Sequence, residues 1–127
     1  MAEQVTLSQQ TASLKDTFHK VDVEINSMFE ELESVMEPLS DSSISHSTKF
    51  DILIGAEYLL VKIRTRVLRE LSSIQSVFSM STKSDVADRL FKERYNTVIL
   101  MCQRLNEFRD DMLLVQRSMW ARNNGRL

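Results

Sequence analysis

Residues 14–39, LKDTFHKVDVEINSMFEELESVMEPL, decide the fold. Apolar side chains recur in this stretch at alternating steps of four and three residues: Leu14, Phe18, Val21, Ile25, Met28, Leu32, Val35 and Leu39. This alternation is typical of a helix that packs lengthwise against other helices. Most positions between these residues are polar, so the apolar stripe is too narrow to form a core alone. The stretch therefore predicts partner helices of similar length.

The composition of the whole chain supports a few long elements. The chain has 127 residues, which is the length of one domain, and only two glycines and one proline. A chain with so few turn-forming residues has few places to reverse direction. Its net charge of -2 and its pI of about 5.7 indicate no overall attraction to nucleic acid or to an anionic membrane.

The helix boundaries follow from local signals. We predict a single helical domain with helices over residues 8–37, 49–80 and 84–121. Pro38 ends the first helix, because proline disfavours helical geometry in the residue before it. Together these signals indicate three helices with an up-down-up arrangement.

Hydroxyl side chains at the two connections supply the helix caps. Thr48 is the expected N-cap of the second helix, and Ser81 or Ser84 that of the third. Residues 38–48 are rich in serine and have no periodicity, so we expect a flexible connector there. The alternative is that this loop is phosphorylated, since its serines lie next to acidic residues.

The second and third helices carry apolar stripes like that of the first helix, and we call each of these three stripes a seam. The second seam is predicted at Leu53, Ala56, Leu60, Ile63, Val67, Leu71, Ile74 and Phe78. The third is predicted at Ala87, Phe91, Arg94 or Tyr95, Val98, Met101 or Cys102, Leu105, Phe108, Met112, Val115 and Met119. The fold class is therefore all-α, with three long antiparallel amphipathic helices and coiled-coil-like seams. A partner chain would complete a larger helical bundle.

The first half of the second helix has more apolar side chains than its seam explains. A helix that is apolar nearly all round is buried on more than one side. We therefore predict that a partner chain covers this region and widened parts of the third helix, at Phe50, Ile54, Tyr58, Leu59, Val61, Leu114 and Trp120. The alternative is that a compact bundle and long side chains cover these residues.

Charge also differs between the first two helices. Residues 8–37 contain two lysines and seven acidic residues, a net charge of -5, whereas residues 49–80 contain five basic and three acidic residues, a net of +2. Lys62, Arg66 and Arg69 form a basic stripe at steps of four and three. We favour an interpretation in which this stripe faces the acidic first helix or an acidic partner. Binding of nucleic acid is the competing interpretation.

No pattern for catalysis, cofactor binding or metal binding is present in the sequence. It has no glycine-rich phosphate loop, no HExxH, no CxxC and no GxSxG motif. His19 and His46 are too isolated to predict a metal site. Cys102 lies beside a seam position, which favours a buried apolar role over a nucleophile. We therefore expect a protein that is not an enzyme and has no cofactor.

Several features bear on the compartment. A single cysteine excludes an internal disulfide framework and suits a reducing compartment. The polar first residues do not form a secretory signal, and the most apolar run, 50–61, is too short to span a bilayer. We therefore expect neither a secreted nor a membrane protein.

Three stretches of the sequence are informative when they are read together. The first is Leu14-Lys15 followed by Asn26-Ser27-Met28-Phe29-Glu30-Glu31. The second is residues 51–78 with the following step of Ser84, Val86 and Asp88. The third is Cys102-Gln-Arg-Leu-Asn-Glu-Phe-Arg-Asp-Asp-Met112. In this order they resemble the three helices of the Mediator subunit twenty-two family, and they cover most of residues 14–112.

This resemblance implies a non-catalytic structural subunit in the head module of Mediator, which is a coactivator of RNA polymerase II. It implies a nuclear hetero-oligomer in which the chain pairs with Mediator subunit eleven and docks on the scaffold subunit seventeen. The alternative is a small coiled-coil adaptor subunit of a vesicle-trafficking or cytoskeletal complex in the cytoplasm.

Overall fold

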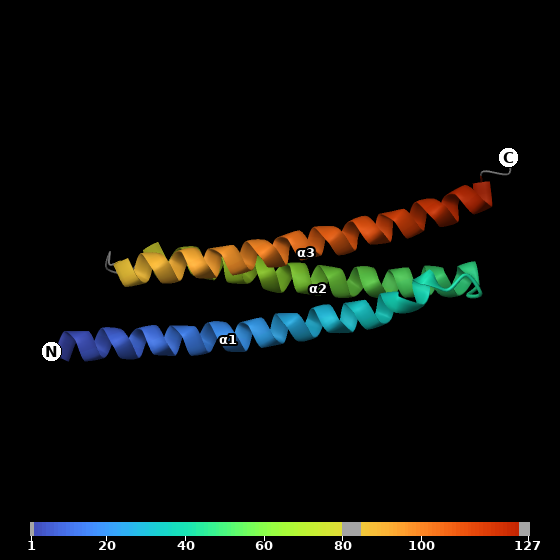
Figure 1. Cartoon of the computed structure of the whole chain (residues 1–127). Helices are drawn as coiled ribbons and strands as arrows, with labels where there is room; N and C mark the ends of the chain where they lie inside the picture. Colours follow the sequence, from blue (N-terminus) through green and yellow to red (C-terminus); the bar gives the residue numbers. More distant parts are fainter. Residues whose placement is uncertain (1, 80–84, 125–127) are drawn as a thin grey trace.

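Three long antiparallel helices make up the fold. The computed structural model describes the backbone of residues 2–79 and 85–124, and the side chains of residues 9, 11–76 and 85–121. The elements are α1 (Ala2–Met36), a short 3-10 turn η1 (Glu37–Ser40), α2 (His46–Ser79) and α3 (Asp85–Asn124) (Figure 1). Across these ranges there is no strand. The predicted all-α class with three antiparallel helices is confirmed.

The predicted seams form the core. Every predicted seam position of the first helix is buried or half-buried, and so is every described position of the second. The Phe78 side chain lies outside the described residues. The largest fully buried side chains come from all three helices: Ile25, Phe29, Leu32, Ile63, Val67, Ile74 and Val98.

The structure resolves two ambiguities of α3 and adds one core residue. Arg94 faces the interior, whereas Tyr95 is exposed. Met101 is buried, and Cys102 packs against the core beside it. Phe29 is fully buried although it lies off the predicted seam of the first helix. Its ring stacks on that of Phe108 in α3, with ring centroids 5.8 Å apart, so an aromatic contact widens the α1 seam.

The connection between α1 and α2 is more regular than predicted. Pro38 lies in the first turn of η1, where its missing N–H leaves no helical hydrogen bond unmade. The Asp41 amide donates to the Pro38 carbonyl over 3.0 Å and closes this turn. Leu39 is buried, which anchors η1 to the core. The predicted loop at 38–48 therefore begins with a hydrogen-bonded turn.

The helix ends differ from the predicted ones. The first helix begins at Ala2 and not at residue 8, and α2 begins at His46 and not at residue 49. The N-cap of α2 is Ser45 and not Thr48, because the Ser45 hydroxyl accepts a hydrogen bond from the Thr48 amide at 3.2 Å. The predicted caps of the third helix, Ser81 and Ser84, lie outside the described residues.

The helix α2 is central to the arrangement. Its backbone packs closely against α1 and against α3, whereas the α1 and α3 backbones stay farther apart. Long side chains bridge α1 and α3: Arg104 of α3 donates a hydrogen bond to Glu33 of α1 over 2.8 Å, and its guanidinium lies over the Phe29 ring. The side of α2 and α3 that faces away from these bridges remains open.

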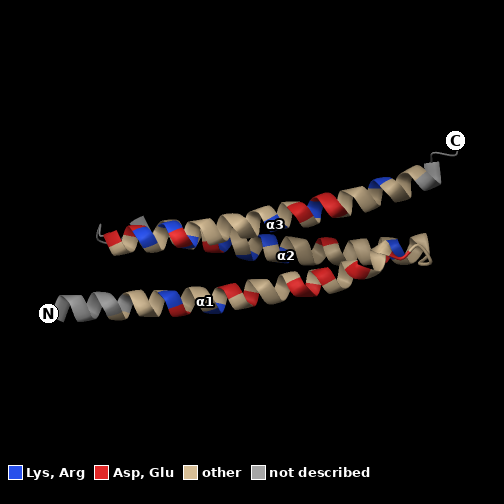
Figure 2. Ribbon diagram, in the orientation of Figure 1, with Lys and Arg blue, Asp and Glu red and all other residues tan. Residues whose placement is uncertain are grey.

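Interhelical ion pairs follow the charge difference predicted between the first two helices. Acidic residues are spread along α1 (Figure 2). Arg66 of α2 contacts Glu24 of α1 at 3.2 Å, which confirms that this member of the basic stripe faces α1. Lys62 instead lies over the Tyr58 ring of its own helix, and Arg69 is exposed. The predicted stripe therefore contributes one bridge to α1.

Candidate partner-binding site

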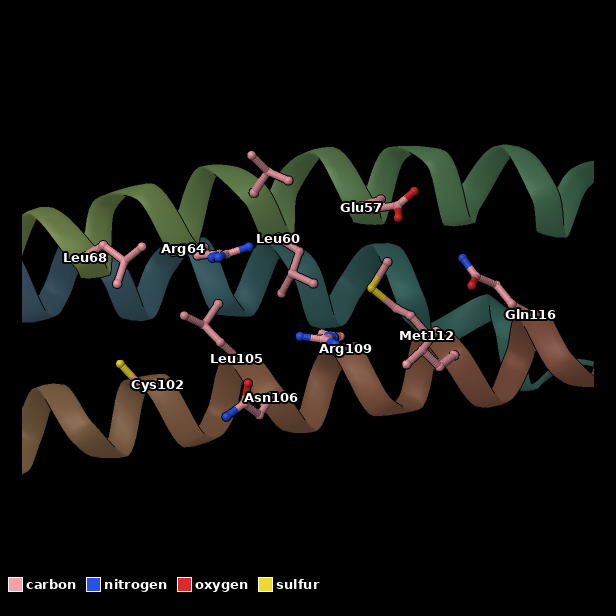
Figure 3. A pocket seen from close by; sticks show the side chains of 12 residues that line it. Glu57, Leu60, Arg64, Leu68, Cys102, Leu105, Asn106, Arg109, Met112 and Gln116 are labelled. Carbon is pink, nitrogen blue, oxygen red and sulfur yellow. The ribbon is translucent and has the colours of Figure 1, made fainter.

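A groove of about 430 Å³ runs along the surface between α2 and α3. Figure 3 shows α2 and α3 as its two walls. Its apolar lining consists of Leu60, Val61, Leu68, Cys102, Leu105, Met112 and Leu113. Its polar lining consists of Glu57, Arg64, Asn106, Arg109 and Gln116. A groove with this much apolar lining can take up the apolar face of an amphipathic helix.

The two walls are helical stripes with the spacing of a second coiled-coil seam. On α2 the stripe is Phe50, Ile54, Glu57, Val61, Arg64 and Leu68, at steps of 4, 3, 4, 3 and 4. On α3 the stripe is Cys102, Asn106, Arg109, Leu113, Gln116 and Trp120, at the same steps. Residues at these steps lie along one face of a helix. On each of the two helices, α2 and α3, the side chains of this stripe therefore form one line along the groove.

The two stripes continue beyond the residues that line the groove. Because α2 and α3 are antiparallel, the beginning of α2 and the end of α3 lie at the same end of the bundle, where Figure 1 shows the two helices diverging. Phe50 and Ile54 continue the α2 line beyond Glu57, and Trp120 continues the α3 line beyond Gln116. Large apolar side chains thus stand on both helices at the same end of the groove.

Six of the seven residues that the sequence predicted to bind a partner are largely exposed. The exposed fractions of Phe50, Ile54, Tyr58, Val61, Leu114 and Trp120 lie between 53 and 68%. Leu59 differs, because it is half-buried and packs against the core. Val61 lines the groove, and Tyr58 stands next to it on α2. Of the seven predicted residues only Val61 lines the groove, so the predicted set does not form one surface.

The charged side chains of the groove were not predicted as site residues. Arg64 and Arg109 place their guanidinium groups between the two helices (Figure 3). Within the described side chains neither forms an ion pair, and neither does Glu57. The signal that could have revealed these positions is the second 4-3 stripe on each helix. These second stripes were not recognised because the core seams beside them are more uniformly apolar.

The described residues contain neither a metal-binding cluster nor a helix that could span a membrane. They contain no group of three or more His, Cys, Asp or Glu side chains that could hold a metal ion. His19 of α1 is exposed, and His46 at the start of α2 is half-buried. In the described part of the chain, no helix is both long enough and apolar enough to cross a membrane.

Comparisons of the chain with models of known protein families, with curated proteins and with solved structures found no match.

Proposed function

We propose that this protein is a non-catalytic structural subunit that holds a helix of a partner chain in a multiprotein assembly. The observation that carries this proposal is the line of exposed apolar side chains on α2, beside the α2/α3 groove. Contiguous exposed apolar surface of this kind marks interaction sites on soluble proteins. Aromatic residues such as Phe50, Tyr58 and Trp120 are also the residue types enriched at interface hot spots.

The bundle geometry supports the same proposal. Three helices with a single central member leave the α2/α3 side open, and a fourth helix in that groove would produce a four-helix arrangement. Both walls already have the seam spacing that such packing requires. A partner helix would bury Val61 and Leu68 on α2 and Leu113 on α3.

The more specific proposal is a subunit of the Mediator head module. Its support is the resemblance of residues 14–112 to the subunit twenty-two family, together with the surface available for a partner helix. In that assembly the partner would be Mediator subunit eleven, with the scaffold subunit seventeen beyond it, and the compartment would be the nucleus.

Affinity capture of the tagged chain from nuclear extract tests the proposal. Near-equal amounts of Mediator head subunits with the wild type are the expected result. Capture of vesicle-trafficking or cytoskeletal subunits in their place would contradict the Mediator assignment but would still support a role as an assembly subunit. Absence of any stoichiometric partner, together with a monomeric, cooperatively melting chain, would overturn the assembly role.

A matched pair of variants ties the capture to the proposed surface. Ile54→Asp places a charge on the exposed apolar face of α2, and we expect it to abolish capture. Val23→Asp makes the same change at an exposed position of α1, away from the groove, and we expect capture to persist. Equal capture by both variants would contradict the use of the α2 face.

A further inference from the structure

The arginines that pair with acidic residues differ in position from the two that line the α2/α3 groove, while Arg69, Arg89 and Arg117 are exposed outside it. Those that lie between the helices have acidic partners: Arg66 contacts Glu24, Arg94 contacts Glu70, and Arg104 contacts Glu33. Arg64 and Arg109 lie in the α2/α3 groove and have no acidic partner among the described side chains. The groove thus contains two cationic groups whose charge no described side chain neutralises in an ion pair.

The neighbouring charges leave the groove cationic. Glu57 is the one acidic side chain that lines it, against two arginines. Figure 3 shows the guanidinium groups of Arg64 and Arg109 between α2 and α3, with apolar side chains such as Leu60 and Leu105 around them. A helix that covered this groove would remove both guanidinium groups from water. That burial is unfavourable unless the covering helix supplies anionic partners.

We propose that the occupant of the groove is an amphipathic helix of a different chain, with acidic residues beside its apolar seam that pair with Arg64 and Arg109. This inference rests on the proposed function and specifies the chemistry of the partner. Guanidinium groups bind carboxylates through two parallel hydrogen bonds, which fixes the register of the docked helix as well as its charge.

The length of the groove sets the length of the occupant. The longer wall, from Cys102 to Gln116 on α3, spans about 21 Å at the helical rise per residue. An occupant of roughly 15 residues covers it, and one of about 20 residues also reaches the level of Trp120. Its seam would meet Val61 and Leu68 on one wall and Leu113 on the other.

A second copy of this chain does not offer such a helix. The apolar seam of the acidic helix α1 is already in the core, and Val23 is its only large apolar side chain that is exposed in the described part. Two-fold pairing of two grooves would place four guanidinium groups against two Glu57 carboxylates. The charge pattern therefore favours a different, acidic chain.

Two synthetic peptides test this inference directly. Each is a helical peptide of about 20 residues with leucine at the seam positions, and the flanking positions carry glutamate in one and lysine in the other. Binding to the full chain is measured by fluorescence anisotropy of a dye on the peptide. At about 50 mM salt we expect the glutamate peptide to bind roughly tenfold more tightly, and the difference to shrink at high salt.

Two residues, one in the groove and one on the α3 stripe beyond it, report the position of the bound peptide. Cys102 is the only cysteine of the chain and lines the groove, so a docked peptide should slow its reaction with a thiol reagent. Trp120 is the only tryptophan and continues the α3 wall, so its emission should shift on binding. Both signals should appear with the glutamate peptide.

Charge reversal provides the matched comparison. In the double variant Arg64→Glu with Arg109→Glu we expect the preference to reverse in favour of the lysine peptide. Arg69→Glu changes an exposed arginine of α2 that does not line the groove, and it should leave the preference unchanged. Unaltered thermal unfolding of both variants by circular dichroism would exclude misfolding as the cause.

The other outcomes separate this inference from the proposed function. Equal binding of both peptides with protection of Cys102 would overturn the acidic occupant and leave the groove as a docking site. Self-association of the chain with protection of Cys102 would overturn it in favour of a second copy. Absence of peptide binding would overturn the acidic-helix inference, whereas the capture experiment decides the assembly role separately.

Discussion

Arg94 of α3 donates two hydrogen bonds to a single carboxylate oxygen of Glu70 in α2, from Nε over 3.2 Å and from Nη2 over 2.9 Å. The side chains of both residues are almost completely buried, with exposed fractions of 3% and 8%. Arg94 also donates to Asp22 of α1, and its guanidinium lies over the Phe18 ring. The side chain of Arg94 therefore links all three helices, at Asp22 of α1, Glu70 of α2 and its own position in α3.

Removal of this arginine should strongly destabilise the protein. Arg94→Met leaves the Glu70 carboxylate buried with only a 3.7 Å contact to Arg66. We expect a loss of about 3 kcal/mol in the free energy of unfolding, measured by urea denaturation. The double variant Arg94→Met with Glu70→Leu should recover most of this loss, because no unpaired charge stays buried. A single variant within about 0.5 kcal/mol of the wild type would show that the ion pair is not needed for stability.

Phe29 should be among the most sensitive positions of the core. It is fully buried, stacks on Phe108 and lies 4.4 Å from the Arg104 guanidinium. Phe29→Ala should lower the free energy of unfolding by about 3–5 kcal/mol, since it leaves a cavity between α1 and α3. Val23→Ala, at an exposed position of the same helix, should change it by less than about 0.5 kcal/mol. Similar effects of the two changes would contradict the packing described here.

Three aspartate substitutions should separate the partner surface from the core. Ile54→Asp, at an exposed position, should leave the melting temperature of the lone chain nearly unchanged. Leu59→Asp should lower stability by about 1–3 kcal/mol, because Leu59 packs against the core. Leu32→Asp should prevent folding, since it buries a charge at a fully buried position. Thermal unfolding followed by circular dichroism measures the order of stability of the three variants. An Ile54→Asp variant as unstable as Leu59→Asp would contradict the predicted order.

The turn after η1 should show a pH dependence of its own. The Asp41 carboxylate accepts hydrogen bonds from the Ser43 hydroxyl at 2.7 Å and from the Ser43 amide at 2.9 Å. These bonds, with a smaller contribution from Lys49, hold the pKa of Asp41 below its usual value. Because the pKa is lowered in the folded state, this contribution to stability is present above the ordinary aspartate pKa and is lost as the pH falls through the lowered one.

An NMR titration of the Asp41 carboxyl group measures this directly. The midpoint should lie below that of an unstructured aspartate, and Ser43→Ala should raise it, because the hydroxyl makes the largest contribution. Ser42→Ala changes the neighbouring serine and serves as the control. A midpoint that is unaffected by Ser43→Ala would contradict the role of the hydroxyl.

The candidate groove was accessible from the sequence only in part. The excess of apolar residues in the first half of the second helix indicated an additional surface, and Phe50, Ile54 and Val61 are exposed there. Arg64 and Arg109 were not recognised, because a charged residue on a helix is ordinarily a solvent-facing one. Only the packing of α2 against α3 places both of them over an apolar floor.

The sequence by itself determined the number, type and order of the elements. The 4-3 repeat from Leu14 to Leu39 and its two counterparts specify which face of each helix is buried, and Pro38 specifies where the first helix ends. These are local properties, because periodicity and proline act within one segment.

The tertiary structure decided how the faces are shared among neighbours. It placed Arg94 and not Tyr95 inside, buried Phe29 against Phe108, and made α2 the central helix with an open groove toward α3. A helical repeat cannot specify these features, since it gives the direction of a face but not the side chains that meet it from another helix.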